Sequence, residues 1–330
     1  MIRSRRSIHP GRRRWPAFAA LAGMALGTAV VIWLGAGQIW HALLRIGWAG
    51  LGYVLLWQLA VFAPQAAGWW ALCPGAAAGP MYWARLVREG GLTCLPLSAV
   101  GGLFFGTRAV MLGGVGWARA AASGVVDTVT EGVSLVPFIV FGLAVLGQRR
   151  VGAPQAELIG GGLAVLLATG GAVWLCRRRL AALGERALTG LLRRWKEDAA
   201  ARAKELRGEL AGLFARPGRF WGATALHGLG WAAGAGNVWI GYHLLGARPT
   251  VLESLALEGL FSGALSVGLL VPGAFGVQEL SYVGIGRLFG LPAPLSLALS
   301  LVRRARDILL GGPALLSWQA IEAARLRRRA

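Results

Sequence analysis

One stretch decides the fold: residues 88–110, REGGLTCLPLSAVGGLFFGTRAV. The stretch is apolar enough to lie in a membrane, but Pro96 and the glycines Gly101, Gly102 and Gly106 interrupt a helix near its middle. It therefore forms either one short span or two half-helices that enter and leave the membrane on the same side. The distribution of charge along the chain chooses between these two structures.

The composition indicates an integral membrane protein. Hydrophobic residues make up 56% of the 330 residues, a share that a soluble domain would expose as aggregation-prone surface. Runs of about 18 or more residues with few charges are long enough to cross a ~30 Å hydrocarbon core as helix. They predict spans at 17–37, 48–72, 120–147, 158–176 and 221–245, and a sixth, charged span is predicted at 291–318.

The basic residues predict the orientation. The net charge is +20, and Lys and Arg gather at the margins of the apolar runs, in 3–14, 177–179, 186–219 and 325–329. The positive-inside rule places these clusters in the cytoplasm. Only the re-entrant form of 88–110 keeps all of them on one side, so both termini are expected to be cytoplasmic. Nucleic-acid binding is not expected, because no folded soluble platform is visible.

A second interrupted segment, 251–289, has Pro272-Gly273 near its centre and is predicted to enter from the opposite face. The two segments are alike, since Glu89-Gly90 opens the first and Glu258-Gly259 belongs to the second. Paired, interrupted segments of opposite orientation are typical of inverted-repeat transporters, whose substrate site lies between them. Coincidental glycine and proline bias is the alternative.

The predicted fold is an all-α, polytopic membrane bundle of about six spanning helices and two oppositely oriented re-entrant segments. The stretch 177–219 has apolar residues at helical spacing and is expected to be an amphipathic helix on the inner surface. The predicted parts are a basic cytoplasmic N-terminus (1–16), a first membrane half (17–176, re-entrant near 89–110), the amphipathic segment (177–219), a second membrane half (220–321, re-entrant near 251–289) and a basic tail (322–330).

Charged residues inside the predicted bundle are the candidate functional residues. An unpaired charge at the bilayer centre costs about 2.5–3.5 kcal/mol on insertion scales, so each needs a partner or water. Asp127 and Glu131 share one helix face and require a cation or a proton between them. Asp307 is spaced to pair with Arg303 or Arg304, which would leave arginine in surplus for an anionic group such as a phosphate. The alternative is that these charges only hold the bundle together.

We expect substrate binding or translocation to involve Glu89, Arg108, Asp127, Glu131, Glu279, Arg303, Arg304, Arg306 and Asp307. Four further residues would shape the broken helices: Pro96, Pro272, Gly273 and Gly276. No metal or cofactor is expected, because the three cysteines and four histidines show no ligand spacing and no GxxxxGK[ST] loop occurs. His227 is expected to be a packed, hydrogen-bonded histidine.

The sequence resembles the lysylphosphatidylglycerol synthase transmembrane (flippase-like) family. The resemblance rests on Glu89-Gly90 with Leu95-Pro96, on VVDTVTE (125–131), on PGAFGVQE (272–279) and on Arg304 to Asp307. The ending RRARDILLGGPALLSWQ (303–319) looks most like the branch found with hopanoid biosynthesis proteins. The resemblance implies a role in moving or handling polar lipids across the inner membrane. The soluble synthase domain of the best-known relatives is not expected here.

These observations predict a flippase-like protein of the bacterial inner membrane that handles a polar or anionic lipid, related to hopanoids or phospholipids. Its partners would be membrane lipids with anionic head groups, together with enzymes of lipid biosynthesis. Two alternatives stay open: a membrane-embedded lipid transferase that uses the same carboxylates as general bases, and a non-catalytic partner in a lipid-synthesis complex. The sequence does not determine the oligomeric state.

Overall fold

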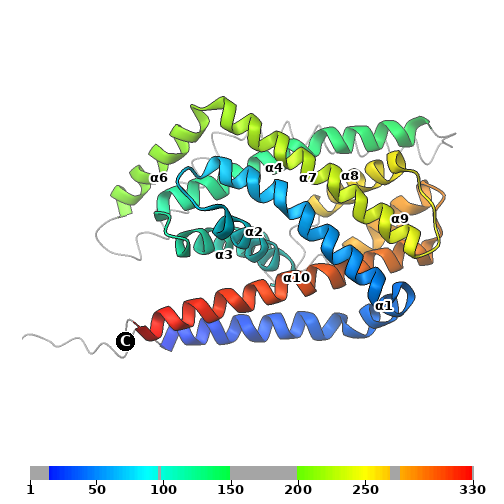
Figure 1. Ribbon diagram of the computed structural model, residues 1–330, viewed down its shortest axis with the longest axis horizontal. Coiled ribbons are helices and arrows are strands. Elements are labelled where there is room, and N and C mark those ends of the chain that lie inside the picture. The colour runs from blue at the N-terminus through cyan, green and yellow to red at the C-terminus, as the bar shows by residue number, and fades with distance from the viewer. Residues whose placement is uncertain (1–14, 96–97, 149–198, 268–275, 329–330) are drawn as a thin grey trace, which may run out of the picture.

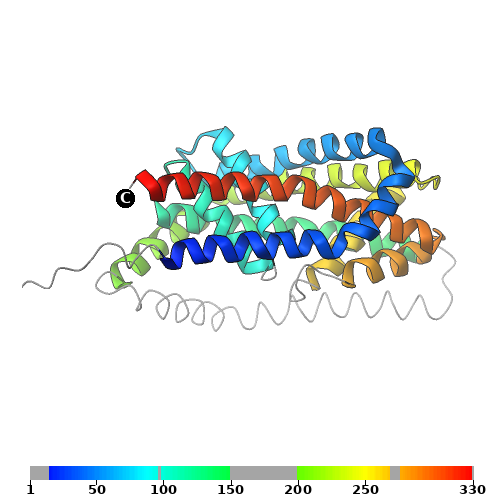
Figure 2. The ribbon, with the colours of Figure 1, turned by 90° about the horizontal axis from the view of Figure 1, so that it is seen from below.

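The chain is built of helices, as predicted. A computed structural model describes residues 15–95, 98–148, 199–267 and 276–328. These ranges hold nine helices and no strand. The long helices run roughly along the longest axis of the molecule (Figures 1 and 2). The predicted span 158–176 and the first part of the amphipathic segment, 177–198, lie outside the described residues.

Helix α1 (Trp15–Leu72) contains two of the predicted spans and divides at Gly47. Gly47 has φ 69° and ψ 170°, a conformation open to glycine but strained for other residues. The chain doubles back near this point, so the second part of α1 returns along the molecule (Figure 1). Helix persists well beyond residue 37, where the hydropathy pattern ended the first span.

The interrupted stretch 88–110 belongs to a helical hairpin. Helix α2 (Ala78–Thr93) and helix α3 (Ser98–Leu112) lie before and after residues 94–97, and the two helices pack closely against each other. A Cβ on Gly91 would lie 2.9 Å from the Gly102 Cα, and one on Gly106 would lie 2.9 Å from the Arg88 Cβ. These pairings require antiparallel helices, because residues farther from the turn on α2 meet residues farther from it on α3.

The second interrupted segment is also a pair of helices. Helix α8 (Val251–Val267) and helix α9 (Val277–Leu288) pack together, and the rings of Phe261 and Tyr282 stack with their centroids 3.8 Å apart. Residues 268–275, which include Pro272 and Gly273, lie outside the described residues. Gly276, just before α9, has φ 79°, so α9 begins as a separate helix, as predicted.

Each hairpin packs against a long helix that follows the other hairpin. Glycine 90 of α2 meets the backbone of Gly311 on α10 (Ala293–Arg328), so closely that neither position has room for a side chain. Similarly, a Cβ on Gly259 of α8 would collide with the Phe138 carbonyl of α4 (Trp117–Gln148). The two Glu-Gly pairs noted in the sequence thus mark two close backbone crossings of helices.

The remaining long helix, α7 (Pro217–Leu244), packs against α1, α4 and α8. Helix α6 (Ala199–Phe214) precedes it and turns Ala203, Leu206 and Leu213 inward while its basic side chains are exposed, as an amphipathic helix requires. Helix α10 continues to Arg328, so the segment 322–328, which was predicted to be a tail, is the last part of this helix.

The bundle carries apolar side chains on its outside. Leu280 is 75% exposed and Trp48 72%, whereas several arginines lie inside. Lipid favours this distribution and water does not. Within the described ranges, Leu44–Leu72 and Trp117–Gln148 are the two helices long and apolar enough to cross a membrane by themselves. The other described helices are shorter, more charged or less apolar, and about six spans were predicted.

The glycine crossing gives a direct test of the packing. We expect Gly311→Ala to lower the free energy of unfolding by about 1–3 kcal/mol, because its methyl group would overlap the α2 backbone. Unfolding in mixed detergent and dodecyl sulfate micelles measures this. The neighbouring change Gly312→Ala is the control, since a Cβ there meets no atom within 4 Å. Equal effects of the two changes would contradict the crossing.

Candidate functional site

A large cavity lies inside the bundle. Its volume is about 520 Å³, and α1, α2, α3, α4, α7, α8, α9 and α10 all contribute to its wall. Apolar residues such as Val61, Phe62 and Leu135 cover part of this wall. The rest is polar, with charged and amide side chains at Gln58, Gln65, Arg85, Arg88, Glu89, Glu131, Glu258, Gln278, Arg303, Arg304, Arg306 and Asp307.

Two arginines of α2 and two acids of α4 form the first charge cluster. Arg88 donates hydrogen bonds both to Asp127 and, at 2.8 Å, to Glu131. Arg85 donates to Glu131 at 2.6 Å and also pairs with Glu89, one turn along α2, at 2.6 Å. The arginines are 2% and 4% exposed, so these pairs replace most of their hydration. The predicted cation between Asp127 and Glu131 is Arg88.

Histidine 227 of α7 extends this cluster. Its Nε2 lies 2.8 Å from Asp127 Oδ1, and both side chains are 0% exposed. Gly68 of α1 leaves room for the imidazole, because a Cβ there would lie 3.2 Å from Nε2. The packed, hydrogen-bonded role expected for His227 is confirmed.

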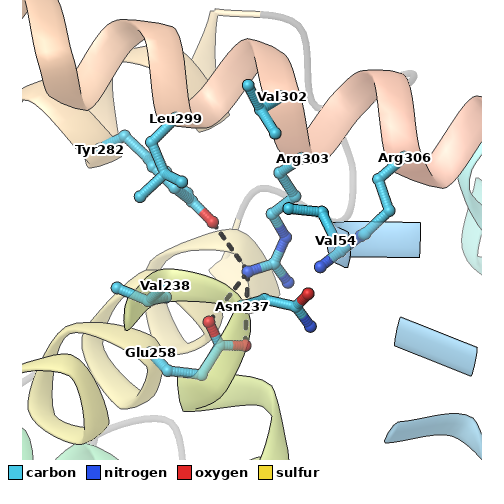
Figure 3. A pocket seen from close by; sticks show the side chains of 9 residues that line it. All are labelled: Val54, Asn237, Val238, Glu258, Tyr282, Leu299, Val302, Arg303 and Arg306. Atoms are coloured by element: carbon cyan, nitrogen blue, oxygen red, sulfur yellow. Dashed lines mark hydrogen bonds and ion pairs between the residues drawn. The ribbon is translucent and has the colours of Figure 1, made fainter. Parts of the chain in front are cut away.

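The second charge cluster joins α8 to α10. Arg303 Nη1 lies 3.2 Å from Glu258 Oε2 and donates to the Tyr282 hydroxyl of α9 at 2.8 Å (Figure 3). Arg306 points into the same small pocket from the next turn of α10 (Figure 3). Ser262 donates to Glu258 at 3.2 Å, so this carboxylate has partners from two helices.

The first turn of α9 is held to α10 by two neighbouring side chains. Gly276 has φ 79° and precedes the helix, and its N–H donates to Glu279 Oε2 at 2.9 Å. The other Glu279 oxygen accepts from Arg304 Nη2 at 2.7 Å, while Gln278 donates to the Ser300 carbonyl at 2.8 Å. Glu279 therefore caps α9 and anchors it at the same time.

Six of the nine predicted site residues line the cavity: Glu89, Glu131, Arg303, Arg304, Arg306 and Asp307. Asp127 lies behind the wall against Arg88, and Glu279 reaches the cavity through its partner Arg304. Arg108 is placed elsewhere, since it pairs with Glu322 near the end of α10 and does not line the cavity. Gly276 shapes the start of α9 as expected, whereas Pro96, Pro272 and Gly273 lie outside the described residues.

The predicted surplus of arginine is wrong for the described residues. Asp307 pairs with Arg306 at 2.6 Å, while Arg303 and Arg304 turn to Glu258 and Glu279. Every arginine that lines the cavity has a carboxylate partner, so the wall is close to electrically balanced. An anionic ligand would have to share these arginines with the carboxylates already bound to them.

Sequence reasoning missed several contributors. Arg85 and Arg88 were not among the predicted site residues, but both are buried and pair with acids of α4. Their spacing of three residues, with Glu89 beside them, was the available signal, because it places all three on one helix face. Glu258 was seen as half of a Glu-Gly pair and not as a partner of Arg303. Gln58 and Gln65 of α1 gave no signal.

One of three comparisons with known proteins found a match. The family model described as the lysylphosphatidylglycerol synthase TM region matches residues 20–312. The chain belongs to this family. Searches of the curated proteins and of the solved structures found no significant match. The lysylphosphatidylglycerol synthase TM region family identifies the chain as a membrane protein tied to lipid handling.

In this member of the family, the charge pairs should also hold the bundle together. We expect Glu258→Gln or Arg303→Gln to lower the free energy of unfolding by about 3–5 kcal/mol, since each leaves a buried charge without its partner. The double variant should lose less than the sum of the two. Equilibrium unfolding of all three proteins measures the coupling.

Arg287→Gln is the matched control, because Arg287 is an exposed arginine near the end of α9. Its effect should stay within about 0.5 kcal/mol. Additive effects of Glu258→Gln and Arg303→Gln would show that the two side chains do not interact.

Proposed function

We propose that the protein translocates a polar lipid across the bacterial inner membrane, with the head group passing through the central cavity. The observation that carries this proposal is a cavity of about 520 Å³ walled by arginines and carboxylates within a bundle whose outside is apolar. Membership of a family tied to lipid handling supports the same function.

The size of the cavity suits a head group. Small-molecule sites commonly measure about 300–1,000 Å³, which holds a phosphate with a sugar, polyol or amino acid. Two long acyl chains would not fit with it, so they would stay in the surrounding lipid. A translocator needs this division, because the apolar chains cross the membrane at little cost and the head group determines the barrier.

The chemistry of the wall favours a head group that includes phosphate. Guanidinium groups offer planar pairs of donors that match phosphate oxygens. Arg306 and its neighbour Asp307 both line the cavity and are paired with each other, so a phosphate can exchange with the carboxylate without leaving Arg306 unpaired. Hopanoid-linked lipids and phospholipids are both candidates for the substrate.

The proposed setting is the inner membrane with both termini in the cytoplasm, since the basic clusters follow the positive-inside rule. Enzymes that synthesise the lipid would be the natural partners. We propose transport without chemical change of the lipid, so the protein is not assigned an enzyme activity.

A leaflet-resolved assay tests the function. The full chain is reconstituted in liposomes with fluorescent phosphatidylglycerol, and dithionite reports the label that remains in the inner leaflet. We expect Arg306→Gln to slow translocation by about tenfold or more, the cost of one lost charge-assisted hydrogen bond. Arg287→Gln, which changes an exposed arginine, should keep the wild-type rate.

The alternatives give different results. A transferase would change the chemical composition of the lipid, which mass spectrometry of the extracted lipids detects. A scaffold would leave the lipid in its leaflet and would tolerate neutral substitutions in the cavity. Either outcome with correctly folded protein would overturn the proposed function.

A further inference from the structure

With every acid ionised, the buried charges of the cavity balance when one histidine is counted among them. The second cluster and the neighbouring pairs of α10 match three arginines, Arg303, Arg304 and Arg306, with Glu258, Glu279 and Asp307. The first cluster instead contains two arginines and three carboxylates. Among the described residues, the first cluster is therefore one positive charge short.

The missing charge has an obvious position. His227 contacts Asp127, a carboxylate of the deficient cluster, at 2.8 Å. Its other ring nitrogen, Nδ1, is buried and has no hydrogen-bond partner in the described part of the chain. A net charge inside a membrane protein is costly, and one proton on the His227–Asp127 pair removes it.

We propose that His227 and Asp127 form a proton-binding site, whose proton neutralises the first charge cluster beside the cavity. The ligand is the proton itself. The proton completes the cluster in the same way that Arg88 completes the contact between Asp127 and Glu131. Nε2 is the ring nitrogen in contact with the carboxylate, and Nδ1 is the nitrogen left to carry the second ring proton.

The charged groups that face His227 from neighbouring helices make the His227–Asp127 pair the position for the proton. From α4, Asp127 contacts the ring directly and Glu131 follows one turn later, while Arg88 and Arg85 of α2 act through these acids. Helix α1 presents Gly68, which has no charge. Of the acids on the other neighbours, Glu258 of α8 is paired with Arg303 of α10, and Glu209 of α6 is paired with Arg119 of α4.

The proton site adds to the proposed function, and its role in transport rests on that function. Glu131 lines the cavity and belongs to the same cluster as Asp127, so charge entering the cavity acts on the His227–Asp127 pair. A phosphate adds negative charge, which favours the bound proton. Head group and proton are therefore expected to occupy the protein together.

Nuclear magnetic resonance of ring nitrogens tests the site without any transport. The full chain is labelled with ¹⁵N-histidine in lipid nanodiscs at pH 7, and His227→Gln assigns the signal among the four histidines. We expect two protonated ring nitrogens on His227. The variant Glu89→Gln removes one carboxylate from the cluster, so its His227 should have one protonated nitrogen. His243→Gln, on the same helix but bonded to its own backbone, is the control.

A neutral imidazole at His227 in the wild type would overturn the proposal and move the proton to a carboxylate such as Glu89. No change of the His227 signal in Glu89→Gln would also overturn it, provided that the His243 signal shows a folded protein. Because the signal is read without transport, a doubly protonated His227 together with a failed leaflet assay would reject the proposed function and retain the proton site.

Discussion

Charge pairing inside an apolar bundle is the constraint on which the rest of the structure depends. A lone arginine or carboxylate would be expensive in this interior, so each requires a partner on a facing helix. The pairs of Arg88 with Asp127 and of Arg303 with Glu258 link α2 to α4 and α10 to α8 through long side chains. Glu279 extends the same rule to a helix terminus, because one of its oxygens caps α9 and the other binds Arg304.

Close backbone contacts make this pairing possible. The long arginine side chains reach their acids only when neighbouring helices are held in register, and Gly90 with Gly311 brings α2 and α10 together without side chains between them. Gly259 does the same for α8 against α4. The helices then enclose a cavity between the two charge clusters, while the large apolar side chains remain on the outside. Sequence, packing and the proposed passage of a head group are connected through these few contacts.

Much of the fold could be predicted from the sequence because apolar length and helix breakers are local signals. The predicted spans 120–147 and 221–245 correspond to Trp117–Gln148 and Pro217–Leu244, and each of the two interrupted segments contains two helices, α2 with α3 and α8 with α9. Helix ends were less predictable. Helix α1 continues past the end of its apolar run, and α10 continues into its basic end, because packing and solvent both tolerate helix there.

The partners of the charges could not be predicted in the same way. Consecutive residues of a helix point about 100° apart, so Arg303 and Arg304 turn to different helices although they are neighbours in the sequence. Local spacing favoured Asp307 as their partner, but Asp307 binds Arg306. Arg108 was predicted to belong to the site from its place in an apolar stretch, and its actual partner, Glu322, is 214 residues away. Such pairs depend on how helices rotate against one another.

The central claim is that a lipid head group enters the charged cavity, and site-specific photo-crosslinking tests it most directly. A benzophenone amino acid replaces Leu92 in the cavity wall, and another replaces Leu280 on the exposed apolar surface. The protein is illuminated in membranes whose phospholipid head groups are isotopically labelled. We predict cross-links through the head group at residue 92 and through the acyl chains at residue 280. Acyl chains alone at both positions would contradict the account.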